Sequence, residues 1–380
     1  MSNQPIEKYE NKLFDCAIIG GGLAGLALSI QLADKGHSVL LVEKNTYPFH
    51  KVCGEYISME SYHFIESLGL NLNELNLPII NTLHITAHNG HQIAAPLAMG
   101  GFGISRYTLD EKLATIAKQK GVILLENCRA TDVTHQLHSS TITTSVGHFQ
   151  AKIICGSYGK ITPSFFERKN TSQKTNYIGV KYHIKIDFPS NVIELHNFKD
   201  GYCGISKIDN ERQCLCYLTT SKQLKENGND IKQLEQNVLM QNPKLKHYFS
   251  KAEFLFEKPL TISNVTFQKK EVYTNGVFLL GDSAGTIAPL CGNGMSMALR
   301  ASQILTNQLH LFFNNTISKT DLTTIYQNNW DAQFKRRIKT GIFLQRFFGK
   351  KLSTFLVLTL LQLSPTLFKK IISLTHGDKF

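Results

Sequence analysis

The chain has 380 residues, 42% hydrophobic and 18% charged, a composition typical of a globular protein of roughly two domains. The formal net charge is +12, but the segment from Asp331 to Phe380 alone has ten Lys or Arg against two acidic residues, which argues against a body-wide nucleic-acid-binding surface. The polar N-terminus lacks the apolar core of a signal peptide, and no apolar run reaches the roughly 18 residues of a membrane span. The eight cysteines form no C-x-x-C pair. We therefore expect a cytoplasmic protein with free thiols, no metal site and no nucleic-acid partner.

The first 45 residues contain the strongest motif. The apolar stretch Phe14 to Ile19 predicts a strand, Leu26 to Lys35 a helix, and His37 to Val42 a second strand. Between the first strand and the helix lies the run G-G-G-L-A-G. A glycine run in this context is typical of a dinucleotide-binding turn.

The residues of this turn have separate expected roles. Gly20 permits the tight turn, Gly22 lets a pyrophosphate approach the backbone, and Gly25 allows close packing of helix and strand. Leu23 and Ala24, at the start of the helix, offer free N–H groups and the positive end of the helix dipole.

The acidic residue that follows the second strand narrows the choice of nucleotide. Glu43, beside Lys44, is placed to accept hydrogen bonds from the two ribose hydroxyls, and it would repel a 2′-phosphate. The motif therefore predicts NAD or FAD.

The stretch H-K-V-C-G-E-Y-I-S, which begins at His50, allows three interpretations: a catalytic cysteine, a metal site or a loop against the cofactor. Its potential ligands are too closely spaced for zinc. We favour a cofactor loop in which His50 and Lys51 approach the phosphates or the ribityl chain and Cys53 and Gly54 lie near the reactive ring. Cys53 also remains a candidate for direct chemistry.

A second nucleotide motif lies far downstream. The buried strand G-V-F-L-L is followed directly by Gly281 and Asp282, then by Pro289 and by the run Gly292, Asn293, Gly294, before a helix begins near Met295. Together with the first motif, this pattern resembles the FAD-binding motifs of the glutathione-reductase-type flavoproteins, specifically the superfamily of para-hydroxybenzoate hydroxylase and geranylgeranyl reductase.

The resemblance implies FAD as the cofactor, with NAD(P)H as electron donor. It gives Asp282 the ribityl hydroxyls and phosphate, and it places Pro289 and residues 292–295 along the flavin. Arg106, in the element I-S-R-Y-T-L-D, would reach the phosphate or ribityl region. One element departs from the family pattern: Gly156-Ser157-Tyr158-Gly159 has Tyr158 where the family has Asp.

Between about residues 176 and 267, alternating strands predict an antiparallel sheet, which in the family forms one wall of the substrate cavity. Tyr202 lies where the reductases have an aromatic element, and we take it as a second catalytic candidate. His183 and Glu55 could also face the cavity, although a lone His on a strand is more often structural. The halogenase motif and a convincing catalytic Lys are missing, which argues against halogenation.

The expected fold is α/β, with a Rossmann-like FAD-binding domain interleaved with an antiparallel-sheet substrate domain and a C-terminal helical segment. The domain limits that we predict are 1–75, 105–165 and 268–315 for the FAD-binding domain, 76–104 and 166–267 for the substrate domain, and 316–380 for the helical segment.

The C-terminal segment alternates basic and apolar residues. It predicts a helical pair that caps the FAD-binding domain, or a surface that contacts an anionic membrane from the cytoplasmic side and admits an apolar substrate.

For function, the leading hypothesis is a geranylgeranyl-reductase-like transfer of hydride from reduced flavin to a carbon–carbon double bond of an apolar prenyl or polyketide-derived substrate. The alternative is an NAD(P)H-dependent flavin monooxygenase that hydroxylates a phenolic or quinone-like substrate. A third possibility is an inactive, FAD-stabilised binding protein.

Overall fold

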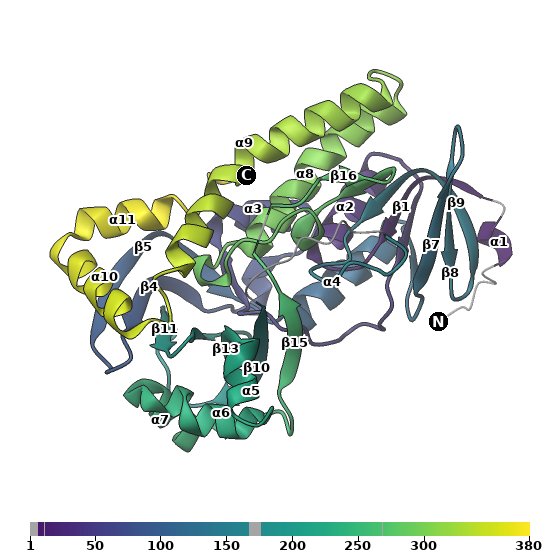
Figure 1. Ribbon diagram of the computed structural model, residues 1–380. Coiled ribbons are helices and arrows are strands. Elements are labelled where there is room, and N and C mark those ends of the chain that lie inside the picture. Colours follow the sequence, from purple (N-terminus) through teal and green to yellow (C-terminus); the bar gives the residue numbers. More distant parts are fainter. Residues whose placement is uncertain (1–6, 11, 167–175, 268) are drawn as a thin grey trace.

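The computed structural model describes residues 7–10, 12–166, 176–267 and 269–380 (Figure 1). The first six residues of the polar N-terminus, and residues 167–175 and 268 within the predicted domain limits, lie outside this description. Two β-sheets form the framework of the molecule, and the helices cover them (Figure 1).

The first sheet carries both glycine motifs. Its parallel part has the strand order β17-β9-β1-β2-β6, and β16, β7 and β8 join it by antiparallel pairing. The strands are β1 (Leu13–Ile19), β2 (Val39–Val42), β6 (Ile123–Leu125), β7 (Ala130–His135), β8 (Ser140–Thr144), β9 (Gly147–Gly156), β16 (Tyr273–Thr274) and β17 (Val277–Leu279). Parallel strands joined through helices confirm the predicted Rossmann-like architecture.

Helices α2 (Leu23–Asp34), α4 (Arg106–Gln119), α8 (Gly294–Phe313) and α9 (Lys319–Gln345) belong to this part of the molecule, with the short helices α1 (Glu7–Glu10) and α3 (Tyr62–Ser67). Helix α2 is buried along most of its length because α4 and α8 pack against it as well as the sheet. This explains why its sequence is apolar on nearly every side.

The second sheet has nine strands in the order β14-β10-β13-β12-β11-β4-β5-β3, with β15 beside β10. All pairs are antiparallel except β4 with β11. The strands are β3 (Tyr56–Ser58), β4 (Ile79–Thr86), β5 (Gln92–Gly103), β10 (Tyr177–Lys185), β11 (Val192–Phe198), β12 (Gly201–Lys207), β13 (Gln213–Thr220), β14 (Glu253–Phe254) and β15 (Leu260–Val265). Helices α5 (Ser221–Glu226), α6 (Ile231–Asn237) and α7 (Pro243–Lys251) lie below it (Figure 1).

One predicted strand of this sheet is divided in two. The stretch F-L-F-E-K-P-L-T-I-S-N-V-T-F, residues 254–267, predicts one long strand. In the structure β14 ends at Phe254 and β15 begins at Leu260, and each pairs separately with β10. Pro259 lies between them. Proline has no N–H to donate and restricts the residue before it, so it interrupts the ladder.

The two C-terminal helices, α10 (Lys351–Leu363) and α11 (Pro365–Ser373), lie on the second sheet and contact β5 (Figure 1). Leu358, Leu361 and Phe368 share a hydrophobic core with β4 and β5. The expected cap on the FAD-binding domain is instead provided by α9, which packs on α8. No single helix in the described residues is long and apolar enough to cross a membrane; α10 and α11 would suffice together, but they are bent by 110°.

Candidate cofactor and substrate site

The carboxyl ends of four parallel strands meet at one edge of the first sheet. Gly20 follows β1, Glu43 follows β2 and Ser157 follows β9. Gly281 lies two residues beyond the end of β17, after Leu280. In open α/β sheets ligands bind at this edge. The structure therefore brings both glycine motifs, separated by about 250 residues in the chain, to one place.

The glycine turn has the geometry that the motif requires. Gly20 has φ +103°, and a Cβ there would lie 2.5 Å from the carbonyl oxygen of Ser157. Gly25 packs against the Gly20 carbonyl so closely that a side chain would collide with it. At Gly22, in contrast, a Cβ would meet nothing closer than 3.8 Å. The backbone at the N-terminus of α2 is therefore accessible to a ligand.

Two cations lie in front of this helix terminus. A Cβ at Gly22 would be 3.8 Å from Lys51 Nζ and 4.0 Å from Arg106 Nη2. Both side chains also bind the buried carboxylate of Asp110, Arg106 at 2.7 Å and Lys51 at 3.0 Å. Two positive charges and one negative charge leave a net positive group beside the N–H groups of α2. This is the arrangement that binds a diphosphate.

Glu43 is buried and supports the turn directly. Its carboxylate accepts hydrogen bonds from Gly21 N at 2.8 Å and from the backbone and side-chain amides of Asn45 at 3.0 and 2.8 Å. A carboxylate has about four acceptor positions, so it retains capacity for the predicted ribose contact. Tyr47 donates its hydroxyl to the Gly21 carbonyl, and Lys44 is exposed.

The second motif connects to the first through neighbouring turns. Gly281 has φ +62°, and a Cβ there would lie 3.2 Å from Ala24 of α2. Asp282 is part-exposed, and its Oδ2 lies 3.9 Å from Lys160 Nζ. Gly159, in the variant G-S-Y-G turn, donates its N–H to Ser283 Oγ at 3.0 Å. That turn therefore lies between the two motifs despite its missing aspartate.

The segment from Pro289 to Met295 ends at the first turn of α8. Buried polar side chains hold it in place through Asn293, and the sequence analysis did not identify them. The buried Asn293 donates to Glu60 and accepts from Arg337 Nη1 of α9 at 3.3 Å. Glu60 also accepts from Gly377 N at 2.6 Å. Nothing in the sequence indicated this partner, because Arg337 is one of several basic residues in the C-terminal segment.

The loop from His50 to Glu55 reaches both motifs. Cys53 Sγ lies 3.7 Å from Met295 Sδ at the start of α8, and Gly54 is exposed. His50 stacks on Tyr107, with ring centroids 4.5 Å apart, and packs against Phe256. Burial, with the neighbouring His183, lowers the pKa of His50 to about 4, so it is neutral near pH 7. Its predicted cofactor contact stays a prediction, because its described neighbours are aromatic.

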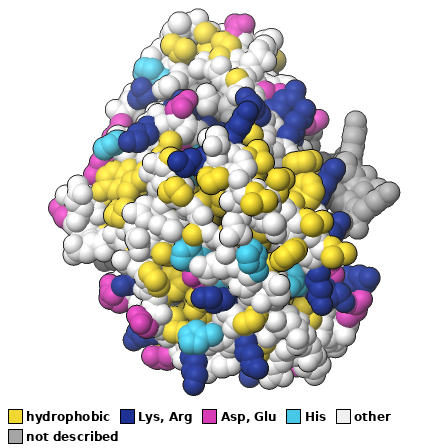
Figure 2. Space-filling model, turned by 90° about the vertical axis from the view of Figure 1, so that its left-hand side faces the viewer, with side chains coloured by type: hydrophobic (Ala, Val, Ile, Leu, Met, Phe, Trp, Pro, Cys, Tyr) yellow, Lys and Arg dark blue, Asp and Glu magenta, His cyan; other side chains and the backbone are white. Residues whose placement is uncertain are grey.

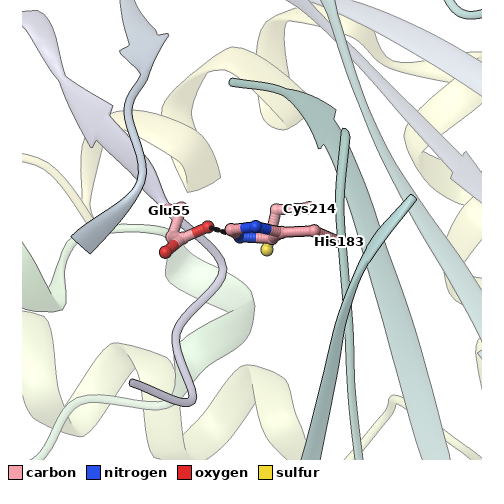
Figure 3. A group of neighbouring side chains, drawn as sticks. All are labelled: Glu55, His183 and Cys214. Atoms are coloured by element: carbon pink, nitrogen blue, oxygen red, sulfur yellow. Dashed lines mark hydrogen bonds and ion pairs between the residues drawn. The ribbon is translucent and has the colours of Figure 1, made fainter. Parts of the chain in front are cut away.

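A buried ion network fixes this loop to the second sheet, and Figure 3 shows its contact between Glu55 and His183. Glu55, fully buried with φ +57°, accepts from Lys181 Nζ at 2.5 Å and from Arg106 N at 2.8 Å, and its second oxygen lies 2.7 Å from His183 Nε2. Lys181 also donates to the Lys51 carbonyl at 3.1 Å. Burial alone would raise the pKa of Glu55, but Lys181 and His183 lower it to about 2. Glu55 therefore links both domains.

The donor atoms of Glu55, His183 and Cys214 lie within 4.8 Å of one another, close enough to consider a metal ion (Figure 3). The Lys181 ammonium already pairs with the same carboxylate. A cation bound there would be repelled by this buried positive charge. Cys214 instead donates its thiol to the Cys53 carbonyl at 3.2 Å, so we interpret the group as a structural clamp on the loop.

Tyr202, the second catalytic candidate, lies on β12 and is 4% exposed. Its ring packs against Phe348, and its hydroxyl has no hydrogen-bond partner within the described part of the chain. Burial raises its pKa well above the usual value, so the hydroxyl stays protonated. The hydroxyl therefore has an unused hydrogen-bond donor.

A cavity of about 530 Å³ lies between β5, α9 and the C-terminal residues. Pro96, Leu97 and Met99 of β5 contribute apolar surface, and Arg336 and Lys369 contribute charge. Tyr56 lines it as well, and the ring of Tyr56 would lie 3.1 Å from a Cβ at Gly292 of the second motif. One aromatic side chain therefore connects the cavity with the flavin motif.

These residues fit FAD. The open backbone at Gly22, the Lys51 and Arg106 cations and the Glu43 carboxylate match a diphosphate and a ribose, and the far motif supplies a helix N-terminus at Gly294. The predicted cofactor residues except His50 and Lys44 lie along these strand ends and loops.

Comparison with known proteins agrees with this geometry. Residues 18–52 match the family model described as NAD(P)-binding Rossmann-like domain, and residues 204–337 match the model described as squalene epoxidase. Among curated proteins, conditioned medium factor receptor 1 of Dictyostelium discoideum is 23% identical over 89% of this chain and 72% of its own length. The 1H-pyrrole-2-carbonyl-[peptidyl-carrier protein] brominase of Pseudoalteromonas luteoviolacea is 23% identical over 77% of this chain and 76% of its own length.

Among solved structures, the flavin-dependent brominase Bmp2 superposes with a TM-score of 0.81 at 18% identity, covering 97% of this chain and 94% of the other. PqsL of Pseudomonas aeruginosa, a probable FAD-dependent monooxygenase, has a TM-score of 0.71 at 15% identity and covers 90% of this chain and 98% of the other. The findings support FAD as cofactor and NAD(P)H as electron donor. The chain therefore has the fold of the flavin-dependent monooxygenases and halogenases, and its relatives are identical to it at about a quarter of the aligned positions or fewer.

Proposed function

We propose that the chain is an NAD(P)H-dependent flavin monooxygenase that inserts one oxygen atom into an apolar substrate with a polar end, of the phenolic or quinone-like kind. One observation carries this proposal. Residues 204–337, which match the squalene epoxidase model, extend from the second sheet through the second flavin motif into α9. We expect the substrate to bind among these elements, and the matched name denotes oxygen insertion. Hydride transfer to a double bond, our leading expectation from sequence, has no comparable support.

The chain's own residues would bind and orient the reactants. FAD, when bound, supplies electrons taken from NAD(P)H and activates dioxygen. Lys51, Arg106 and the N-terminus of α2 hold the diphosphate. The Glu55 network keeps Cys53 beside Met295 at the start of α8. The loop that would lie beside the flavin is thus held in place by buried, paired groups.

The substrate would occupy the cavity behind Tyr56. Its volume of about 530 Å³ lies within the usual range of small-molecule sites. The apolar β5 residues suit a hydrocarbon body, and Arg336 with Lys369 suits a phenolate or another polar head. Tyr202, the other catalytic candidate, is not among the residues that line this cavity.

The deciding experiment is turnover of the FAD-loaded protein with NADPH and a panel of prenylated phenols and squalene, under isotopically labelled dioxygen. We expect products that gain one oxygen atom derived from the gas, and no product without oxygen. Anaerobic products that gain two hydrogen atoms would show a reductase instead. Bromide in parallel reactions tests the halogenase alternative, in which bromine replaces hydrogen in the product.

The cavity assignment has its own variant. Ala98→Trp places a large ring in the cavity that Ala98 lines, and we expect KM for the turned-over substrate to rise about tenfold with unchanged FAD content. Ala94→Trp is the matched control, because Ala94 is exposed on the same strand outside the cavity lining. Equal KM values for the two variants would contradict the assignment.

A further inference from the structure

Helices α10 and α11 present an apolar surface that the rest of the described chain leaves uncovered (Figure 2). On α10 the buried residues Thr354, Leu358 and Leu361 face the second sheet. The opposite side of the helix is also apolar: the exposed residues there are Leu352 (80%), Phe355 (41%), Leu356 (64%), Leu360 (54%) and Leu363 (79%). Their spacing of three and four residues puts them on one face.

Solvent-exposed large hydrophobic residues are ordinary when they are scattered, but a contiguous group marks an interaction surface. Here the group continues onto α11 through Leu367. The two helices together are long and apolar enough for one span, but they are bent by 110° and so do not form a continuous one. Because its inner face is packed on β5, the pair can lie flat against an apolar phase but cannot insert across one.

The charges on this pair of helices have one sign. Lys350 and Lys351 lie at the start of α10, and Lys369 and Lys370 lie on α11; all four are exposed. None of the four forms an ion pair with another residue of the described chain. No Asp or Glu occurs between residues 332 and 377. The apolar face is therefore bordered by unpaired cations.

We propose that the α10–α11 surface docks onto the interface of an anionic lipid bilayer. The leucine face would enter the region between headgroups and acyl chains, and the four lysines would contact anionic headgroups. Docking places the cavity, which Lys369 and Ile372 of α11 also line, next to the lipid. Delivery of an apolar substrate from the bilayer to that cavity rests on the proposed function, whereas docking itself does not.

Other occupants fit this surface less well. In a symmetric dimer the same patch faces itself, which would bring the lysines of both copies together without an acidic partner. An acidic carrier protein would match the cations, but it would leave the central leucines against a charged surface. A bilayer with anionic headgroups satisfies both the apolar centre and the cationic border.

The test is co-sedimentation of the full FAD-loaded chain with sucrose-loaded vesicles of phosphatidylcholine alone and of phosphatidylcholine with phosphatidylglycerol. We expect binding to the mixed vesicles and at least about tenfold weaker binding to the neutral ones. Leu356→Asp/Leu360→Asp and Lys350→Glu/Lys351→Glu should each weaken binding to mixed vesicles by about tenfold or more.

Matched controls separate docking from misfolding. Leu137→Asp changes a 90% exposed leucine in the β7–β8 turn, and Lys232→Glu/Lys251→Glu changes two exposed lysines on α6 and α7; both should bind like the parent. Far-UV circular dichroism and flavin absorbance verify folding of every variant.

The proposal would be overturned if the parent protein bound neither kind of vesicle. It would also be overturned if all variants bound the mixed vesicles as well as the parent does. A dimer in sedimentation velocity that Leu356→Asp/Leu360→Asp dissolves would assign the surface to a second copy instead. Because vesicle binding is measured without turnover, its outcome is independent of whether the enzyme proves to be a monooxygenase.

Discussion

Two buried glutamates bind side chains from opposite faces of strand β10, and their environments differ in one respect. Glu55 meets Lys181 and His183, which point toward the cofactor loop, whereas Glu235 of α6 meets the hydroxyls of Tyr182 and Tyr217. Lys181 and His183 lower the pKa of Glu55 to about 2 against the effect of burial. Burial raises the pKa of Glu235 to about 7, although the tyrosine hydroxyls oppose this.

The difference shows what kind of partner a buried carboxylate needs. Neutral hydroxyls satisfy its acceptors but do not balance its charge, whereas an adjacent cation does both. On the side of β10 that faces the cofactor loop, the carboxylate belongs to a fixed ion network. On the side that faces α6, the carboxyl group of Glu235 titrates near neutral pH. The positions alternate along one strand because successive side chains point to opposite faces.

The largest effect on stability is expected from removing the charge of Glu55, which pairs with Lys181 and His183. Glu55→Gln leaves Lys181 buried without a counter-charge, and we expect a loss of about 3–5 kcal/mol in the free energy of unfolding, measured by urea denaturation. The loop that carries Cys53 should loosen, with weaker FAD binding measured by fluorescence titration. The double variant Glu55→Gln/Lys181→Met should recover a large part of the stability; an additive loss would contradict the charge argument.

The second prediction concerns how the stability contributed by Glu235, whose partners are neutral tyrosine hydroxyls, depends on pH. The pKa of Glu235 in the folded protein, about 7, lies above its ordinary value of 4.5. The contribution of Glu235 to stability is therefore fully present below about pH 4.5 and is lost as the pH rises to about 7. Between about pH 5 and pH 8 the free energy of unfolding should fall by about 2 kcal/mol relative to the Glu235→Gln variant. Glu55, with a lowered pKa, contributes in the opposite sense, and its contribution disappears only as the pH falls from 4.5 toward about 2.

A flat difference between the parent and Glu235→Gln across this range would mean that Glu235 is ionised throughout. The tyrosine bonds would then be stronger than the burial penalty, and the contrast between the two faces would disappear.

The smallest effect comes from one hydroxyl. Tyr182→Phe removes one of the two donors to Glu235 Oε1, each 2.9 Å away. We expect a loss of about 1 kcal/mol in stability near neutral pH and a further rise in the pKa of Glu235, which the pH dependence of unfolding would detect. Tyr62→Phe, which removes an exposed hydroxyl bonded to Asn73 at 3.0 Å, serves as the control and should leave both quantities unchanged.

Much of the framework could be predicted from local pattern. The glycine turn, the strand of β1, the helices α2 and α8 and the capping of residues 59–61 by Ser58 all follow from short-range rules. The break at Pro259 was also readable, since proline cannot continue a ladder, yet the apolar alternation on both sides concealed it. The site residues stay predictions, although their positions at the strand ends agree with the expected roles.

The polar clamp on the loop could not be predicted in this way. The stretch G-V-K-Y-H-I-K-I indicated a strand with charged residues on one face, but nothing nearby in sequence named Glu55 as the partner, 126 residues from Lys181. The same holds for Asn293 with Glu60, 233 residues apart. Sequence periodicity reports which face a residue occupies, and it carries no information about which distant element covers that face.

The sequence by itself determined the cofactor class, because binding a dinucleotide places steric demands on consecutive residues, and only glycine at those positions meets them. It also located the basic, apolar C-terminal segment. Tertiary structure decided where that segment lies, on the second sheet with a leucine face outward, and which buried charges are paired. Those properties depend on contacts between residues far apart in the chain, which form only when both sheets are assembled.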